Sequence, residues 1–213
     1  HTIYNNALIA NQNNDSSSAY TVKQAKEPLD TIVQKFPESE GGINARNLLT
    51  QVLHPSINLT TEKVNVPALP FRTLVSYKNL NTIYFRILEL TPQLKKEVAD
   101  GNENDQIFQK LTAQKNIKNW KQDLPGATDY ISHSTEVKID ALPVGEYVLL
   151  GSASADFSLD KNPLAAQYFY FSDISFINSG QQYFVLNRTT GQPLSGAKIQ
   201  VWKQTYDYNS HIN

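Results

Sequence analysis

The first fifty-five residues have a helical hydrophobic period. Their apolar positions recur at spacings of three, one and three along a single face: Leu29, Ile32, Val33 and Phe36. This spacing predicts an amphipathic helix over 27–36, with Pro28 in its first turn, where proline is tolerated. A second such pattern predicts a helix over 39–53 that Ser39 caps and Pro55 ends.

Upstream of these helices the pattern is weaker. Apolar residues at 3–10 indicate the end of an earlier helix, and 11–18 is a linker too rich in Asn and Ser to pack. We therefore expect residues 1–55 to form a helical segment.

From Ser56 onward, alternation replaces the helical period, and β-branched and aromatic residues dominate. The alternating runs predict these strands: 57–60, 64–69, 74–77, 82–90, 117–121, 130–139, 146–155 and 167–177. Pro67 and Pro70 suit an edge strand, and Asn79 suits a turn joining 74–77 and 82–90 as a pair. The expected fold over 56–178 is an antiparallel β-sandwich, which makes the chain mainly β.

One polar stretch, 92–115, interrupts the strands. Leu94, Val98, Ile107, Phe108 and Leu111 follow helical spacings, and a break at 100–102 divides them. We expect one or two short helices inserted between strands. Two interpretations stay open for them, a decoration of a loop and a binding arm.

The last segment predicts two more strands, 183–186 and 197–202, around a turn centred on Gly191. Two strands alone are marginal in water, so we interpret 179–213 as the first strands of a further, incomplete β domain. The chain also begins with His1 and contains no methionine. Both observations lead us to expect a piece of a longer protein.

Composition excludes several classes of function. The 213 residues carry 19 Lys plus Arg against 20 Asp plus Glu, so no basic surface for nucleic acid is expected. The absence of cysteine rules out disulfides, zinc–thiolate sites and thiol nucleophiles within this chain. The longest apolar runs are strand-sized, far below the roughly 20 residues of a membrane span. No signal peptide is visible.

Candidate catalytic and ligand-binding residues are few. The histidines, His1, His54, His133 and His211, are scattered, so they predict no metal site, and His54 suits a helix C-terminus. Acidic residues gather in the β region: Asp105, Asp123, Asp129, Glu136, Asp140, Glu146, Asp156 and Asp160. Their spacing does not predict a glycosidase pair, and turn positions favour structural roles. Calcium binding at 156–162 is a weaker alternative.

Two further clusters have structural and functional interpretations. Gly151–Ser154 lies in a predicted strand, where small residues favour close packing over nucleophilic chemistry. In Tyr168–Phe171 the tyrosines share one face and the phenylalanines the other. We expect core phenylalanines beneath tyrosines that cover the inserted helices or a neighbouring domain; a sugar-stacking tyrosine ladder is the alternative. No catalytic, cofactor or metal residue is predicted.

The turn segment resembles the start of a macroglobulin domain. Its residues read Asn187-Arg188-Thr189-Thr190-Gly191-Gln192-Pro193-Leu194-Ser195-Gly196-Ala197-Lys198-Ile199-Gln200-Val201-Trp202. Upstream, Ile83-Tyr84-Phe85-Arg86-Ile87, Trp120, Leu124-Pro125, Asp129-Tyr130 and Leu142-Pro143-x-Gly145-Glu146-Tyr147-Val148-Leu149-Leu150 resemble bacterial alpha-2-macroglobulin proteins, in an MG2-like form found in Bacteroidetes. The likeness covers about 57–205. The sequence Lys35-Phe36-Pro37-x-Ser39 is similar to a tetratricopeptide-like turn.

This resemblance implies a function for the whole parent protein. Members of the alpha-2-macroglobulin family are broad-range endopeptidase inhibitors, secreted or anchored in the cell envelope, and many capture peptidases through a thioester. The implied partners are target peptidases and neighbouring macroglobulin domains, and the implied location is extracytoplasmic. We expect this chain to be a non-catalytic structural part, with no enzyme activity or cofactor of its own. A surface adhesin or carbohydrate-binding Ig-like module is the alternative.

Overall fold

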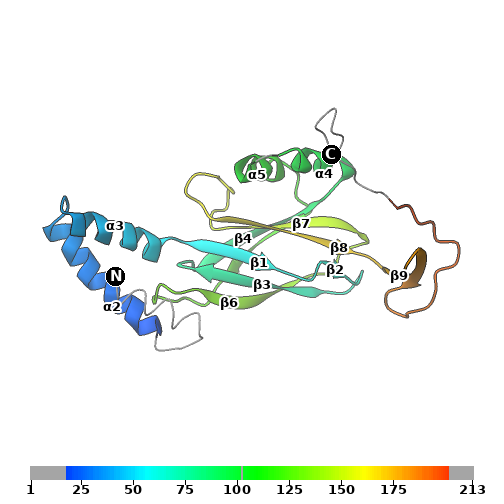
Figure 1. Ribbon diagram of the computed structural model, residues 1–213, viewed down its shortest axis with the longest axis horizontal. Helices are drawn as coiled ribbons and strands as arrows, with labels where there is room; N and C mark the ends of the chain where they lie inside the picture. The colour runs from blue at the N-terminus through cyan, green and yellow to red at the C-terminus, as the bar shows by residue number, and fades with distance from the viewer. Residues whose placement is uncertain (1–17, 102, 202–213) are drawn as a thin grey trace.

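A computed structural model describes residues 18–101 and 103–201. It begins with two antiparallel helices, α2 (Ser18–Lys35) and α3 (Glu40–Leu53), which project from one end of the molecule (Figure 1). Their shared core consists of Val22, Leu29, Ala45, Leu48 and Val52. Ser39 caps α3 as predicted, because its Oγ accepts a hydrogen bond from the Gly42 N–H at 3.0 Å.

The prediction that Pro28 lies in a first helical turn is wrong. Helix α2 begins at Ser18, so Pro28 lies in its interior. A proline there removes one helical hydrogen bond, at a cost of about 3 kcal/mol, which the packing of Val22 and Leu29 against α3 offsets. Ser18, expected in the linker, is therefore helical. The rest of that linker and the helix expected over 3–10 lie outside the described residues.

Two β-sheets face each other in the centre of the molecule (Figure 1). The smaller has the order β1-β3-β6, formed by Ser56–Thr60, Phe71–Lys78 and His133–Ile139. The larger has the order β2-β8-β7-β4-β5, formed by Val64–Asn65, Leu164–Phe171, Gly145–Ser152, Thr82–Glu89 and Lys118–Asp123. All neighbours are antiparallel except β2 and β8. The edge strand expected over 64–69 lies at an edge, but it forms only over 64–65, before Pro67 and Pro70.

This arrangement confirms the predicted mainly β, immunoglobulin-like sandwich preceded by a helical hairpin. The core between the sheets is built around aromatic side chains, with Phe85, Phe169 and Phe171 at most 1% exposed. Gly151 allows the sheets to approach, because a Cβ added there would lie 3.3 Å from Leu59 Cδ1. The chain passes from one sheet to the other between β1 and β2.

The expected pairing of 74–77 with 82–90 is wrong. Both segments are strands, but β3 pairs with β1 and β6, whereas β4 pairs with β5 and β7. Asn79 does make the turn, with a φ of 54°. The connection crosses between the sheets, and the Asn79 Nδ2 donates to the Val52 carbonyl of α3 at 2.8 Å.

The polar stretch 92–115 forms two short helices, as predicted. These are α4 (Pro92–Ala99) and α5 (Asn104–Thr112), and they cover the outer face of the larger sheet (Figure 1). Leu94 and Leu111 from the helices are buried against Leu88, Val148 and Leu150 from the sheet. The molecule therefore has three layers over this region. None of the described helices is long and apolar enough to cross a membrane.

The single strand expected over 167–177 is divided in two. Strand β8 ends at Phe171, and a new hairpin follows, formed by β9 (Ile174–Ser179) and β10 (Gln182–Asn187). The Ser172 Oγ accepts a hydrogen bond from the Ile174 N–H at 3.1 Å, which stabilises the turn between the strands. The position 178/179, where we placed a domain boundary, falls inside this hairpin; the division into domains itself stays a prediction.

Candidate interaction surface

The β9–β10 hairpin is apolar on both faces. Its register pairs Phe176 with Val185 on one face and Ile177 with Phe184 on the other. Gly180, with a φ of 60°, makes the turn. A hairpin in water normally shows one polar face, so this pattern indicates contact on both sides.

These side chains are unusually exposed. Phe176 is 66% exposed, Ile177 58%, Ile174 55% and Phe184 52%. Every other strand of the described chain is part of the sandwich, where the phenylalanines of β8 are at most 1% exposed. Apolar groups gathered in this way mark contact sites on folded proteins.

The segment after β10 is ordered by hydrogen bonds of its turn residues. Asn187 Oδ1 accepts from the N–H groups of Thr189 and Thr190 at 3.0 and 2.9 Å. Gly191, with a φ of 70°, lets the chain reverse, and the Leu194 N–H then donates to the Val185 carbonyl at 2.8 Å. The motif that resembled a macroglobulin turn thus has a local structural role.

The second strand expected at the C-terminal end, 197–202, is not formed over 197–201, and Trp202 lies outside the described residues. Residues 197–201 have no strand partner in the described chain. They lie beside the hairpin instead and enclose with it a cleft of about 670 Å³. Its walls include Phe176, Tyr183, Val185 and Ile199, and Lys198 is the single charged residue among them. The cleft therefore suits apolar side chains.

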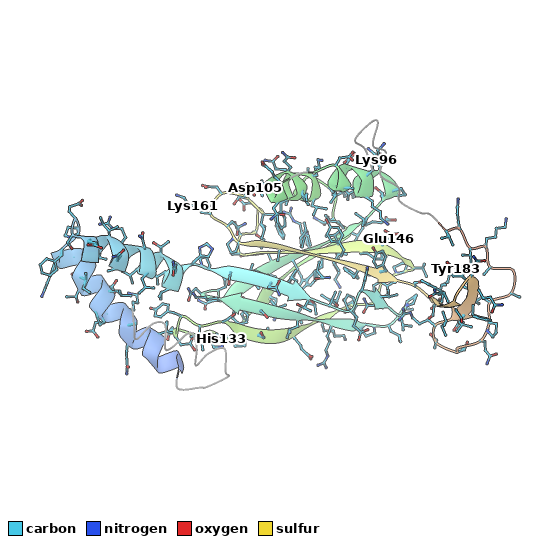
Figure 2. The ribbon with its side chains drawn as sticks, in the orientation of Figure 1. Lys96, Asp105, His133, Glu146, Lys161 and Tyr183 are labelled. Atoms are coloured by element: carbon cyan, nitrogen blue, oxygen red, sulfur yellow. The ribbon has the colours of Figure 1, made fainter. Side chains whose placement is uncertain are left out.

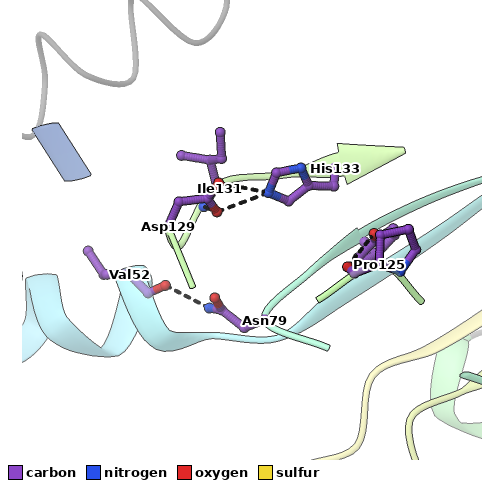
Figure 3. Close-up of polar contacts among 7 residues, drawn as sticks. Val52, Asn79, Pro125, Asp129, Ile131 and His133 are labelled. Atoms are coloured by element: carbon purple, nitrogen blue, oxygen red, sulfur yellow. Dashed lines mark hydrogen bonds and ion pairs between the residues drawn. The ribbon is translucent and has the colours of Figure 1, made fainter. Parts of the chain in front are cut away.

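A second contact region joins the helical hairpin to the sandwich (Figure 3). Asn79 and Lys78 donate to the last carbonyls of α3, those of Val52 and Gln51. On the other side, Tyr130 and Ile131 from the β5–β6 connection pack on the helical core. The helices are thus held at the sandwich by two loops as well as by the direct link into β1.

Asp129 fixes the shape of that connection. Its Oδ1 lies 2.9 Å from His133 Nε2 and accepts a hydrogen bond from the Ile131 N–H at 3.3 Å (Figure 3). Tyr130, between Asp129 and Ile131 in the sequence, has a φ of 62°. The sequence reasoning missed this pair, although a spacing of four residues between an aspartate and a histidine was a signal that could have found it.

The structure separates most of the acidic candidates. Four of them pair with single cations: Asp123 with Lys121, Glu136 with Arg72, Asp140 with Lys118 and Glu146 with Lys95. The hydrogen bond from Lys118 holds the pKa of Asp140 below its usual value, and that from Lys121 does the same for the pKa of Asp123. Asp105 lies on α5 (Figure 2) and Asp160 in the β7–β8 loop, both exposed. Among the described residues, no three His, Asp or Glu side chains are grouped to hold a metal ion.

The 156–162 loop, considered above for calcium, uses its polar atoms internally. Asp156 Oδ1 accepts from Ser154 Oγ at 2.6 Å and from the Ser158 N–H at 3.0 Å, and these bonds lower the pKa of Asp156. Asn162 Nδ2 donates to the Ser158 carbonyl and to Ser152 Oγ. Ser152 is fully buried, and its Oγ also donates to the Ser154 carbonyl at 2.7 Å.

Most of the remaining candidate residues also lie at positions where they have a structural role. Phe169 and Phe171 lie in the core, and Tyr168 packs against the cluster beneath the inserted helices, as the structural interpretation predicted. Burial raises the pKa of Tyr168. His54 follows the last turn of α3 as its C-cap residue. His1 and His211 lie outside the described residues.

No family model matches this chain, and no curated protein has a matching sequence. Among solved structures, it is similar to native alpha-2-macroglobulin from Escherichia coli spanning domains MG0-NIE-MG1, with 15% identity and a TM-score of 0.44, over 66% of this chain and 48% of that one. The chain thus corresponds to about half of that structure.

Two further structures are similar at lower scores. The NIE-MG1 structure of the same Escherichia coli protein has 16% identity and a TM-score of 0.40, over 67% of this chain and 74% of the other. A CARDB domain from Pyrococcus furiosus, solved with di-metal ions, has 10% identity and a TM-score of 0.32, over 55% and 87%. Scores of this size do not establish membership of a family.

Proposed function

We propose that this chain is a non-catalytic, architectural part of an alpha-2-macroglobulin-like protein. In this proposal the sandwich that ends with β8 is an MG2-like domain of the type found in Bacteroidetes, and the β9–β10 hairpin begins the next macroglobulin domain. The parent is a broad-range endopeptidase inhibitor located outside the cytoplasm, either in the envelope or secreted. This chain helps to build the shell that encloses a peptidase.

The placement of the resembling residues supports an architectural role. The motif that begins at Leu142-Pro143 leads into β7, the strand between β8 and β4 in the larger sheet. Tyr147 from this motif stacks on Phe169 at 5.7 Å between ring centroids. Gly145 leaves space for the same tyrosine, since a Cβ there would lie 2.9 Å from its hydroxyl oxygen. Gly145 and Tyr147 of the motif therefore serve packing.

The exposed hairpin is the observation that carries the proposal. It follows the sandwich directly, it is apolar on both faces, and its cleft accepts apolar side chains. A neighbouring β domain would cover such a surface, whereas a free-standing binding module would leave it in water. The sugar-stacking alternative has less support, because Tyr168 is half-buried against the inserted helices.

A peptidase-protection assay on the full-length parent tests the proposal. After reaction with a shell-forming inhibitor, a peptidase should still hydrolyse a small fluorogenic peptide, because that peptide diffuses into the shell. It should lose most of its activity on a large protein substrate, which the shell excludes. An equal loss of peptidase activity on both substrates, or no loss on either, would argue against the trap. This chain alone should not inhibit the hydrolysis of either substrate, and it should not turn over peptide or glycoside substrates.

A further inference from the structure

Four polar side chains lie together on the outer face of the larger sheet, where β4 pairs with β5. Phe85 of β4 is buried between the sheets, so its neighbours Tyr84 and Arg86 point to the opposite, outer face. On β5, Lys121 lies opposite Tyr84. In the same register, Asn119 lies opposite Arg86. Residues that lie opposite each other in an antiparallel pair share a face of the sheet, so the four lie side by side.

These residues line a pocket of about 240 Å³, and Ala155 and Phe157 of the β7–β8 loop complete its wall. The two charged residues among those that line it, Arg86 and Lys121, are both cations. Sites for drug-sized ligands have volumes of about 300–1,000 Å³. This pocket is smaller, and so it suits a single polar side chain.

Arg86 is held in place by the β7–β8 loop. Its Cζ lies over the ring of Phe157, 4.0 Å from the centroid, and Phe157 is only 3% exposed. One guanidinium N–H donates to the Ala155 carbonyl at 3.3 Å. A guanidinium has five N–H donors in a fixed plane, so the others are left for a ligand. An arginine that is already held in this way loses little side-chain entropy when it binds.

Arg86 has no carboxylate partner among the described residues, because none of the ion pairs there includes it. Arg72, on the smaller sheet, differs in this respect, since it pairs with Glu136. The acidic residue nearest to the pocket along the loop is Asp156, and its Oδ1 accepts from Ser154 Oγ and a backbone N–H instead. The charge of Arg86 is therefore uncompensated.

Lys121 adds a second positive charge to the pocket. Its Nζ lies 3.1 Å from Asp123 Oδ1, and both side chains are more than half exposed. Exposed pairs of this kind are worth at most about 1 kcal/mol. The Nζ can therefore also approach an anion in the pocket, although Asp123 competes with that anion for it.

We propose that this pocket binds a carboxylate that belongs to a glutamate or aspartate of an acidic peptide segment. The Arg86 guanidinium donates to both carboxylate oxygens, and Lys121 and Asn119 supply further N–H donors. A pocket sized for one side chain favours an acidic residue of a larger partner over a free small acid, because the partner adds contacts around it. The site does not depend on the proposed role in a peptidase trap.

A titration followed by NMR of the arginine Nε–H signals tests this site on the whole chain. The probe is the peptide acetyl-Ser-Glu-Ser-amide, and the matched neutral peptide is acetyl-Ser-Gln-Ser-amide. We expect a saturable shift of the Arg86 signal and at least about threefold weaker binding of the neutral peptide. Arg46 is the internal control, because it is exposed on α3 and also donates to one backbone carbonyl, that of Pro37 at 3.0 Å. Its signal should not show a saturable shift.

Three substitutions separate the parts of the site. Lys121→Gln removes the second cation and should weaken binding of the glutamate peptide by about twofold to fivefold. Asp123→Asn removes the competing carboxylate and should strengthen binding by about twofold, which a purely structural role of the pocket would not produce. Arg86→Lys keeps the charge but loses the planar fork, and it should bind at least about threefold more weakly.

Lys138→Gln is the matched control for Lys121→Gln. Lys138 is exposed on β6 of the smaller sheet, so its loss should leave binding unchanged. If Arg86→Lys loosens the loop, the exposed positions Lys121 and Asp123 provide the comparison on a folded chain.

Four results would overturn the proposal. The first is no shift of the Arg86 signal throughout the titration, and the second is equal binding of the two peptides. The third is equal shifts of the Arg86 and Arg46 signals, which would indicate general attraction to cationic side chains. The fourth is tighter binding of glutarate than of the glutamate peptide, which would assign the pocket to a free small acid instead.

Discussion

At the scale of single residues, the structure depends on a few side chains that join elements distant in the sequence. Asn79 is one of them, because its backbone takes a φ of 54° while its Nδ2 donates to the Val52 carbonyl at 2.8 Å. Asparagine tolerates the left-handed conformation better than most residues. Its turn was predictable from its type, but its hydrogen bond to a helix 27 residues upstream was not.

We predict that Asn79→Ala lowers the free energy of unfolding by about 2 kcal/mol. It removes the hydrogen bond and adds backbone strain, each of about 1 kcal/mol. Asn79→Gly removes only the hydrogen bond and should cost less. Chemical denaturation of the two variants measures the difference, and equal losses for both would contradict the account of the strain.

Three tyrosines predict how stability depends on high pH. Burial raises the pKa of Tyr77, Tyr147 and Tyr168, and Asp129 raises that of Tyr77 further. A group whose pKa is raised in the folded state contributes stability below its unfolded pKa, about 10, and loses it as the pH rises further. We therefore expect unfolding to become easier above about pH 10.

Tyrosinate absorbance compared with circular dichroism measures this effect. The absorbance of these tyrosines should rise only together with the loss of tertiary signal. The single substitution Tyr168→Phe should make the loss of folding stability at alkaline pH less steep than in the unchanged chain. Complete ionisation of all tyrosines near pH 10 in a chain that remains folded would show that they are not buried as described.

At the scale of elements, the hydrophobic period identified the helices and strands well and their partners poorly. Alternation located β3 and β4, yet it did not show that they belong to different sheets, because alternation shows which faces a strand buries and not which strands it pairs with. The residues expected as one strand over 167–177 became two for a similar reason. The hydrogen bond at Ser172 turns the chain there, and alternation contains no sign of it.

The inserted helices are held to the sheet mainly by apolar contacts. Leu111 of α5 is fully buried in the cluster with Leu88 and Val148. Leu111→Ala should therefore cost about 2–5 kcal/mol at this contact. We expect hydrogen exchange to become faster across α4 and α5 while β7 stays protected.

Leu53→Ala serves as the control for this substitution. Leu53 is 43% exposed at the end of α3, so the same truncation should have little effect there. Equal acceleration of exchange in the helices and in β7 for Leu111→Ala would contradict the interpretation of α4 and α5 as a separate layer packed on the sandwich.

At the scale of the whole molecule, the sequence was informative about fold class and about the turn motif, but not about surfaces. Strand β10 was visible as an apolar run and β9 only as the end of a longer predicted strand, whereas their exposure became evident only from the structure, because burial depends on what the rest of the chain covers.

The central claim is that the β9–β10 hairpin is a surface for a neighbouring domain. Hydrogen exchange of its amides tests this most directly, in this chain and in the same chain extended at its C-terminus along its own gene. We predict rapid exchange in this chain, compared with β7, and protection by at least about tenfold in the extended one. Equally rapid exchange in both polypeptides, or protection already as strong as that of β7 in this chain, would contradict the claim.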